Sequence, residues 1–190
     1  MVPLPLLLLL VAAPAEDAGA GPIAGTWTVV DGSTVAYHLV HKLHSVEGVA
    51  HAVEGKARVT PDGGLQFAVR ARVAAFDSGN SNRDAHMLEV TEAARFPSVT
   101  ARGAAEGLRL GAVPATVELP LRATLDLHGV ARQLAVTARV RFESPGRAEV
   151  EAIFPVSLTD HGVERPSLLF VKVEDRIEIV AKLVLVREPP

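Results

Sequence analysis

Residues 115–143 read ATVELPLRATLDLHGVARQLAVTARVRFE. Apolar and polar residues alternate on both sides of the turn-forming pair His128-Gly129. A period of two residues places an apolar face and a solvated face on each strand, which is typical of an antiparallel sheet. The stretch therefore predicts a long β-hairpin that buries one of its faces.

The same alternation recurs along the chain, with turn-forming Gly, Pro and Asp residues between the runs. It is looser in 33–42 and weaker in 47–60, and the pair Asp31-Gly32 predicts a turn ahead of the first of these. Clear alternation predicts strands near 65–76, 115–128, 133–143, 148–158 and 176–187.

About eight long strands with one apolar face each predict an all-β fold, either a closed antiparallel barrel or a sandwich, and the length of the strands favours the barrel. Closure removes sheet edges, which would be long and exposed here. A barrel of this size holds a small ligand or is filled by its own side chains. Several inward positions are small and would leave volume unfilled in a barrel: Ala71, Ala123, Ala138, Ala152 and Ala181. The alternative is a packed sandwich core with ordinary alanines, and periodicity alone does not decide between the two.

One segment lacks the strand pattern. Residues 82–97 read NRDAHMLEVTEAARFP, in which Asn82 and Thr91 are suitable N-caps for two short helical turns. We therefore expect a short helical segment near 80–96. Between long strands, such a segment would lie across one end of the barrel as a plug or a lid.

Composition excludes several classes of function. The 190 residues include 19 Lys+Arg and 22 Asp+Glu, a net charge of −3, so the strongly basic surface that nucleic acids select is absent. The chain contains no cysteine, which excludes disulfides, thiolate metal sites and cysteine nucleophiles. The length suits one domain.

The N-terminal residues 1–20, MVPLPLLLLLVAAPAEDAGA, predict a signal peptide. Their apolar stretch is too short to span a bilayer, and two small-x-small sites suit cleavage after Ala15 or Ala20. No Lys or Arg precedes the leucines, so a buried strand is the alternative. We expect a mature domain over 21–190, without a transmembrane segment, in the periplasm or secreted.

Short blocks spread over about 25–187 resemble the YceI-like family, the lipocalin-like polyisoprenoid-binding proteins. Their order and spacing carry the resemblance more than any single block does. The blocks are Trp27-Thr28-Val29-Val30-Asp31, Val35-Ala36-Tyr37 with His41, Val46-Glu47-Gly48, Arg83-Asp84-x-His86-Met87-Leu88 with Phe96-Pro97, Leu127-His128-Gly129-Val130, the run from Val156 to Val163, and Lys172-Val173-x-Asp175-x-Ile177.

The resemblance implies a closed eight-stranded antiparallel barrel like that of a lipocalin, often exported, whose apolar lumen holds a long isoprenoid or another lipid chain. It favours the barrel over the packed sandwich core. Two features depart from the family pattern. His38 and His44 flank the matched His41 as additional histidines, and the lumen carries few aromatic residues.

The alternation along the strands predicts which residues face the lumen, and the helical segment predicts which residues lie at its rim. We expect ten side chains to point into the lumen and bind the ligand: Tyr37, Leu39, Phe67, Val69, Leu119, Leu121, Val136, Val140, Phe154 and Ile179. Arg83, Asp84 and His86 are expected to fix the segment to the rim together with His41, while Met87 and Leu88 close the apolar mouth.

These residues predict a binding protein that sequesters or carries a long apolar chain, with no catalytic residue, cofactor or metal. Its partner would be an isoprenoid or another long-chain lipid, and a homodimer stays open. One alternative is a metal-assisted enzyme that uses the cluster His38, His41, His44 and His51, although no two of these have the i, i+2 spacing that chelates from one strand face. The other is a filled barrel that serves as a structural or stress-response module.

Overall fold

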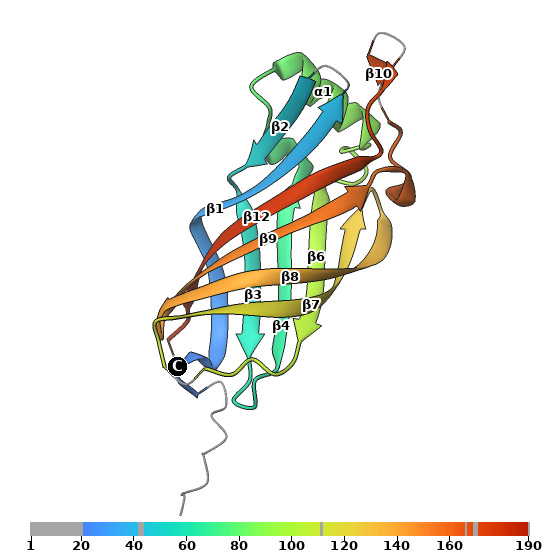
Figure 1. Cartoon of the computed structure of the whole chain (residues 1–190). Coiled ribbons are helices and arrows are strands. Elements are labelled where there is room, and N and C mark those ends of the chain that lie inside the picture. The colour runs from blue at the N-terminus through green and yellow to red at the C-terminus, as the bar shows by residue number, and fades with distance from the viewer. Residues whose placement is uncertain (1–20, 42–43, 111, 166, 169–170, 190) are drawn as a thin grey trace, which may run out of the picture.

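Eight long strands wrap into a closed antiparallel barrel (Figure 1). The computed structural model describes residues 21–41, 44–110, 112–165, 167–168 and 171–189, so the expected signal peptide lies outside the described residues. The barrel strands, in their order around it, are β1 (Gly25–His41), β3 (Val53–Val59), β4 (Leu65–Arg72), β6 (Ser98–Ala105), β7 (Ala115–Leu127), β8 (Val130–Ser144), β9 (Arg147–Ser157) and β12 (Arg176–Arg187), which pairs with β1 again.

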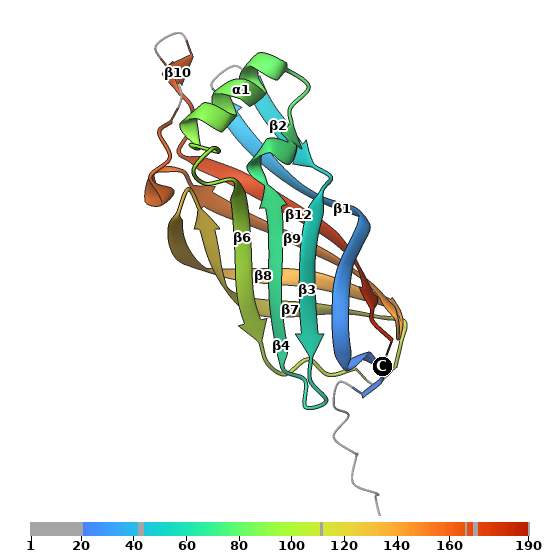
Figure 2. The ribbon, with the colours of Figure 1, turned by 180° about the vertical axis from the view of Figure 1, so that it is seen from behind.

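Shorter elements extend the barrel at its two ends. Beyond the barrel strands, β2 pairs with β1 and β5 pairs with β2, while β10 and β11 form a separate hairpin. The helix α1 lies across the end that β2 and β5 extend (Figure 2). These elements are η1 (Gly21–Ile23), β2 (His44–Ala50), η2 (Val73–Ala75), β5 (Phe76–Asp77), α1 (Ser81–Val90), η3 (Thr159–His161), β10 (Ser167–Leu168) and β11 (Val171–Lys172).

The hairpin of β7 and β8 forms as the sequence predicts. Its strands pair from Ala115 with Phe142 to Leu127 with Val130. The two turn residues, His128 and Gly129, have φ angles of 56° and 70°. Positive φ at both central residues is what a two-residue type I′ turn requires, and this turn matches the twist of the strands that it joins.

The pair Asp31-Gly32 is a bulge inside β1, so the turn expected there is wrong. Pairing with β12 shifts register between Val30 and Thr34, and Gly32 has a φ of 93°. A dipeptide that favours positive φ serves a bulge as well as a turn. The bulge lets β1 continue, with β3 as its neighbour before it and β2 after it.

The strands predicted from clear alternation are confirmed, most of them within a few residues. The expected strand 65–76 is shorter, because β4 ends at Arg72 and the chain continues as η2 and β5. The weak run 47–60 contains two strands, β2 and β3. Strand β6 was not predicted, since its inward positions after Val99 are Ala101, Gly103 and Ala105, which give almost no hydrophobic contrast.

The end of the barrel opposite α1 is closed by apolar packing. Ile23 of η1 is fully buried there, and its carbonyl accepts a hydrogen bond of 2.9 Å from Nε1 of Trp27. The Trp27 ring meets the ring of Phe142 edge to face, with centroids 5.9 Å apart. Leu108 and Leu110 from the β6–β7 connection are buried in the same cluster. These residues form the floor of the barrel.

Ser33 satisfies the backbone groups that the bulge would leave unpaired, which gives a test of this part of the fold. Its hydroxyl donates to the Val30 carbonyl at 2.7 Å and accepts from the Val184 N–H at 2.9 Å, and the residue is only 2% exposed. We expect Ser33→Ala to lower the free energy of unfolding by about 1–3 kcal/mol, since it leaves buried polar groups without partners. Urea denaturation measures the change. The exposed Ser45, replaced by alanine, is the control, and an equal effect of both substitutions would contradict this role of Ser33.

Candidate functional site

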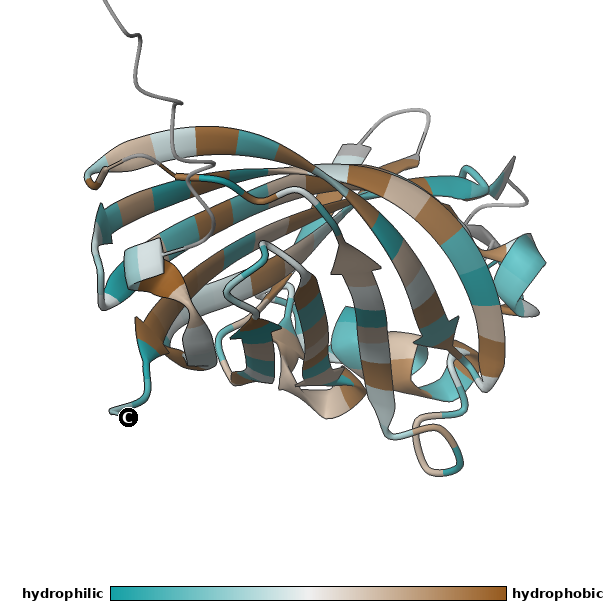
Figure 3. Ribbon diagram, turned by 90° about the horizontal axis from the view of Figure 1, so that it is seen from below, coloured by the Kyte–Doolittle hydropathy of each residue, from teal (hydrophilic) through white to brown (hydrophobic). Residues whose placement is uncertain are grey.

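The inward faces of the strands enclose a cavity of about 340 Å³. This lies within the range of ligand pockets, roughly 300–1,000 Å³, so the barrel is hollow. Apolar and polar residues alternate along the strands, as the banding in Figure 3 shows. Small residues keep the lumen open: its wall includes Ala57, Ala71, Ala101, Ala123, Ala138, Ala148, Ala152 and Ala181.

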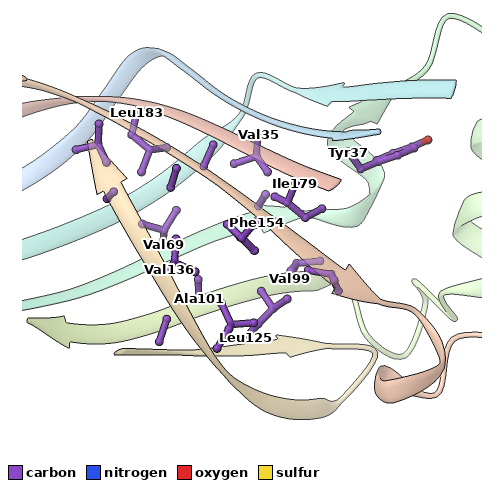
Figure 4. A pocket seen from close by; sticks show the side chains of 18 of the residues that line it. Val35, Tyr37, Val69, Val99, Ala101, Leu125, Val136, Phe154, Ile179 and Leu183 are labelled. Carbon is purple, nitrogen blue, oxygen red and sulfur yellow. The ribbon is translucent and has the colours of Figure 1, made fainter. Parts of the chain in front are cut away.

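All ten residues that the sequence assigns to the lumen lie on the cavity wall. They come from six strands, and Figure 4 labels five of them: Tyr37, Val69, Val136, Phe154 and Ile179. The other five are Leu39, Phe67, Leu119, Leu121 and Val140. The structure therefore brings these side chains together, and their contact with a ligand remains a proposal.

The wall also contains residues that the sequence did not single out. Trp27 lines it from β1, Phe76 from β5, and Val99 and Ala101 from β6. The alternation of Val99, Ala101 and Gly103 with Thr100 and Arg102 was present in the sequence as a faint signal. It was hidden because alanine and glycine contrast little with polar neighbours.

Two glycines let aromatic rings lie against the wall instead of across the lumen. Tyr37 pairs across the strands with Gly48, and Phe67 pairs with Gly103. A Cβ atom at Gly48 would lie 2.4 Å from the Tyr37 ring, and one at Gly103 would lie 2.7 Å from the Phe67 ring. Each ring occupies the space that a side chain on the facing strand would take, so the centre of the lumen stays free.

The start of α1 is anchored to the loop that precedes it. Asn80 is the N-cap, and its side chain accepts a hydrogen bond of 3.1 Å from the Arg83 N–H. Arg83 donates from Nε and Nη2 to the hydroxyl and carbonyl of Ser78, at 2.8 and 2.7 Å. Asp84 accepts from the Ser78 N–H and hydroxyl, at 3.1 and 2.5 Å. Arg83 and Asp84 thus hold the helix through one serine next to β5.

The helix is a single segment, so the expectation that Asn82 and Thr91 begin two helical turns is wrong. Thr91 lies at the C-terminal cap, where its hydroxyl donates to the Met87 carbonyl at 2.6 Å. A threonine hydroxyl can serve either end of a helix, so its position in the sequence did not decide between them.

The turn after α1 is tied to the β7–β8 hairpin. A carboxylate oxygen of Glu92 lies 3.1 Å from Nε2 of His128, whose Nδ1 lies 3.2 Å from the carbonyl of His161. The Phe96 ring meets the His128 ring edge to face, with centroids 4.9 Å apart. Polar contacts therefore hold both ends of the helical segment, while no residue of α1 is fully buried.

One face of the helical segment covers the cavity. Arg83, His86, Met87 and Val90 line the wall from α1, with the i, i+3, i+4, i+7 spacing of a single helix face. Asp84 and Leu88 project from other sides of the helix and do not line the cavity, so Leu88 does not close the mouth as expected. Nδ1 of His86 lies 3.5 Å from a Glu89 carboxylate oxygen of the same helix, instead of holding the rim. The side chain of His41 lies outside the described residues.

The histidine cluster that would serve a metal-assisted enzyme is only partly described. Nε2 of His38 lies 3.7 Å from a carboxylate oxygen of Glu47, and His51 is exposed. The side chains of His41 and His44 lie outside the described part. Among the described residues, no group of three or more His, Cys, Asp or Glu side chains is placed to hold a metal ion. The enzyme hypothesis therefore gains no support from them.

Tyr37 is the polar member of the apolar wall near α1. Its ring is tilted against that of Phe76, with centroids 5.7 Å apart, and its hydroxyl end points away from the other labelled side chains (Figure 4). Partial burial raises the pKa of the Tyr37 hydroxyl, the negative charge of Asp84 raises it further, and the positive charge of Arg83 lowers it. The hydroxyl is therefore neutral at neutral pH.

The fold and the lumen define a class of protein, the lipocalin-like β-barrel with an apolar cavity. The family model of the YceI-like domain matches residues 27–185, so the chain belongs to this family. A search of curated proteins by sequence found no match. Within the described residues, no helix is long and apolar enough to cross a membrane.

Several solved structures share this fold. A polyisoprenoid-binding domain from Saccharophagus degradans has a TM-score of 0.69 at 17% identity and covers 85% of this chain and 98% of its own. BcnA from Burkholderia cenocepacia has a TM-score of 0.64 at 17% identity, covering 80% and 95%. The YceI protein of Campylobacter jejuni has a TM-score of 0.60 at 14% identity, covering 80% and 90%. At these identities the likeness concerns the fold.

Proposed function

We propose that this protein binds a long apolar chain, a polyisoprenoid or another lipid, in the lumen of its barrel. The observation that carries the proposal is the hollow interior of about 340 Å³, walled by Val, Leu, Ile, Phe and Ala from the floor to α1. The similar structure from Saccharophagus degradans is that of a polyisoprenoid-binding domain, which agrees with this ligand class.

Hydrophobic transfer would supply the affinity. Burying one methylene contributes roughly 0.8 kcal/mol, so a five-carbon isoprene unit contributes about 3–4 kcal/mol before the cost of ordering it. Three or four buried units would therefore give micromolar binding or better. The wall offers few hydrogen-bonding groups, so we expect selection by the length and girth of the chain.

The ligand would enter at the end that α1 covers. The floor around Trp27 and Ile23 is closed by fully buried side chains, whereas no residue of α1 is fully buried. Met87 faces the lumen there, and its flexible thioether suits contact with a moving chain. The helix would act as a gate that is held by polar contacts at its two ends.

We also propose that the protein is exported and carries its ligand in the periplasm or outside the cell. The support is the sequence of residues 1–20, with its leucine run and small-x-small sites. Mass spectrometry of the exported chain tests this. A first residue of Glu16 or Gly21 is expected, and an uncleaved Met1 in the exported fraction would contradict it.

A substitution that fills the lumen tests the proposed binding. Ala123 of β7 is buried and lines the cavity, so we expect Ala123→Phe to occupy ligand space and weaken binding of a fluorescent isoprenoid analogue at least about tenfold, a loss of roughly 1.4 kcal/mol. Equilibrium titration measures the affinity. The control is Ala135→Phe on the exposed outer face of β8, which should bind normally. Equal affinity of the two variants, both folded by circular dichroism, would count against binding in the lumen.

Substitution of Ser78, which contacts both Arg83 and Asp84, tests whether α1 acts as a gate. Ser78→Ala deletes the hydroxyl that contacts both Arg83 and Asp84. We expect release of the fluorescent analogue in stopped-flow experiments to become several times faster while its equilibrium affinity changes less than about twofold, because a gate affects entry and exit equally. Asn82→Ala, on the exposed side of the same helix turn, is the control. Unchanged release combined with a lower thermal midpoint would make the segment purely structural.

A further inference from the structure

In the described part of the chain, the wall of the lumen carries basic and hydrogen-bond-donating groups but no carboxylate. Its ionisable members among the described residues are Tyr37, Lys56, Arg83 and His86. Lys56 is already paired, since its Nζ lies 2.7 Å from a carboxylate oxygen of Glu188, and β3 holds it opposite Thr28 of β1, near the floor. The groups at the α1 end are therefore the ones that remain for a ligand.

Two of the three guanidinium nitrogens of Arg83 donate hydrogen bonds that hold the side chain in place. Its Nε and Nη2 donate to Ser78, and Asp84 holds the same serine through its N–H and hydroxyl. Among the described residues, no hydrogen-bond partner is found for Nη1 of Arg83. Arg83 and Asp84 thus have different roles: both residues anchor the helix, but only Arg83 also lines the cavity.

Tyr37 approaches the same place from β1. Gly48 and Phe76 fix the position of its ring, and the charges of Arg83 and Asp84 both act on its hydroxyl. No hydrogen bond of this hydroxyl is found within the described part of the chain. It is therefore a neutral donor that lines the same cavity as the anchored Arg83.

We propose that Arg83 and Tyr37 form a head-group site that binds the anionic oxygens of an amphiphile, a phosphate or a carboxylate, whose tail lies in the lumen. The inference rests on the proposed function. A closed apolar floor accepts only the tail, so the head lies at the α1 end. Charge-assisted hydrogen bonds from a guanidinium suit anionic oxygens. Neither nearby carboxylate lines the wall: Asp84 accepts from Ser78, and Glu89 lies beside His86. The charge of Asp84 still acts on the Tyr37 hydroxyl, and more strongly than that of Arg83.

The test uses three compounds with one tail of four isoprene units: geranylgeranyl monophosphate, geranylgeranoic acid and geranylgeraniol. We expect the full chain to bind the two anions about tenfold more tightly than the alcohol, as one charge-assisted contact at a partly exposed site would give. Arg83→Gln should reduce this preference, measured as the ratio of the affinities for anion and alcohol, to less than about twofold, and Arg83→Lys should restore part of it. Tyr37→Phe should also lower this ratio. Arg95→Gln, a cation beside the same helix but off the wall, is the control.

Each other outcome has a distinct meaning. Equal affinities for all three compounds, unchanged by Arg83→Gln, would overturn the head-group site and leave the proposed function standing. A uniform loss for all three compounds in Arg83→Gln would also overturn it, because Arg83 would then act only as an anchor of α1. No binding of any compound would contradict the proposed function itself. Tighter binding of the phosphate than of the acid assigns the site to phosphate, and the reverse order assigns it to carboxylate.

Discussion

Pairing of β1 with β12 closes the barrel, and the lumen depends on this closure. Without it, the apolar faces of eight strands would lie open to water, with two unpaired edges. The pairing runs from Trp27 opposite Arg187 to His38 opposite Glu178, interrupted only by the bulge after Val30. Because the bulge bends β1, one strand can complete the wall beside β3 and then continue beside β2 at the end that α1 covers.

Closure creates an interior, and small side chains keep it hollow. Alanines recur on the inner face, and Gly48 and Gly103 let the rings of Tyr37 and Phe67 lie flat against neighbouring strands. Large apolar side chains at the alanine positions would fill the barrel, as in a packed core. The chain instead concentrates its tight packing at the floor, around Ile23, Trp27 and Phe142, and leaves the rest of the interior available for a ligand.

Much of the fold follows from the sequence. In a strand with one buried face every second residue is apolar, and these residues show which face is buried. The β7–β8 hairpin and the ten assigned lumen positions follow from that alternation alone. It failed where the contrast is small, as in β6, or where one dipeptide suits two structures, as Asp31-Gly32 suits a turn and a bulge. Near α1, the sequence singled out residues but not the groups that they contact. That Arg83 and Asp84 both hold Ser78, and that Leu88 faces away from the cavity, depends on how a single helix is placed over the barrel.

Occupation of the lumen by a long apolar chain is tested most directly by mass spectrometry of the protein purified from its native compartment. Native spectra give the mass of anything bound, and spectra of an organic extract identify it, while metal analysis of the same sample tests the rival use of the histidines. We expect one isoprenoid or other long-chain lipid per chain, released only by the organic solvent. A stoichiometric metal with no extractable lipid would contradict it.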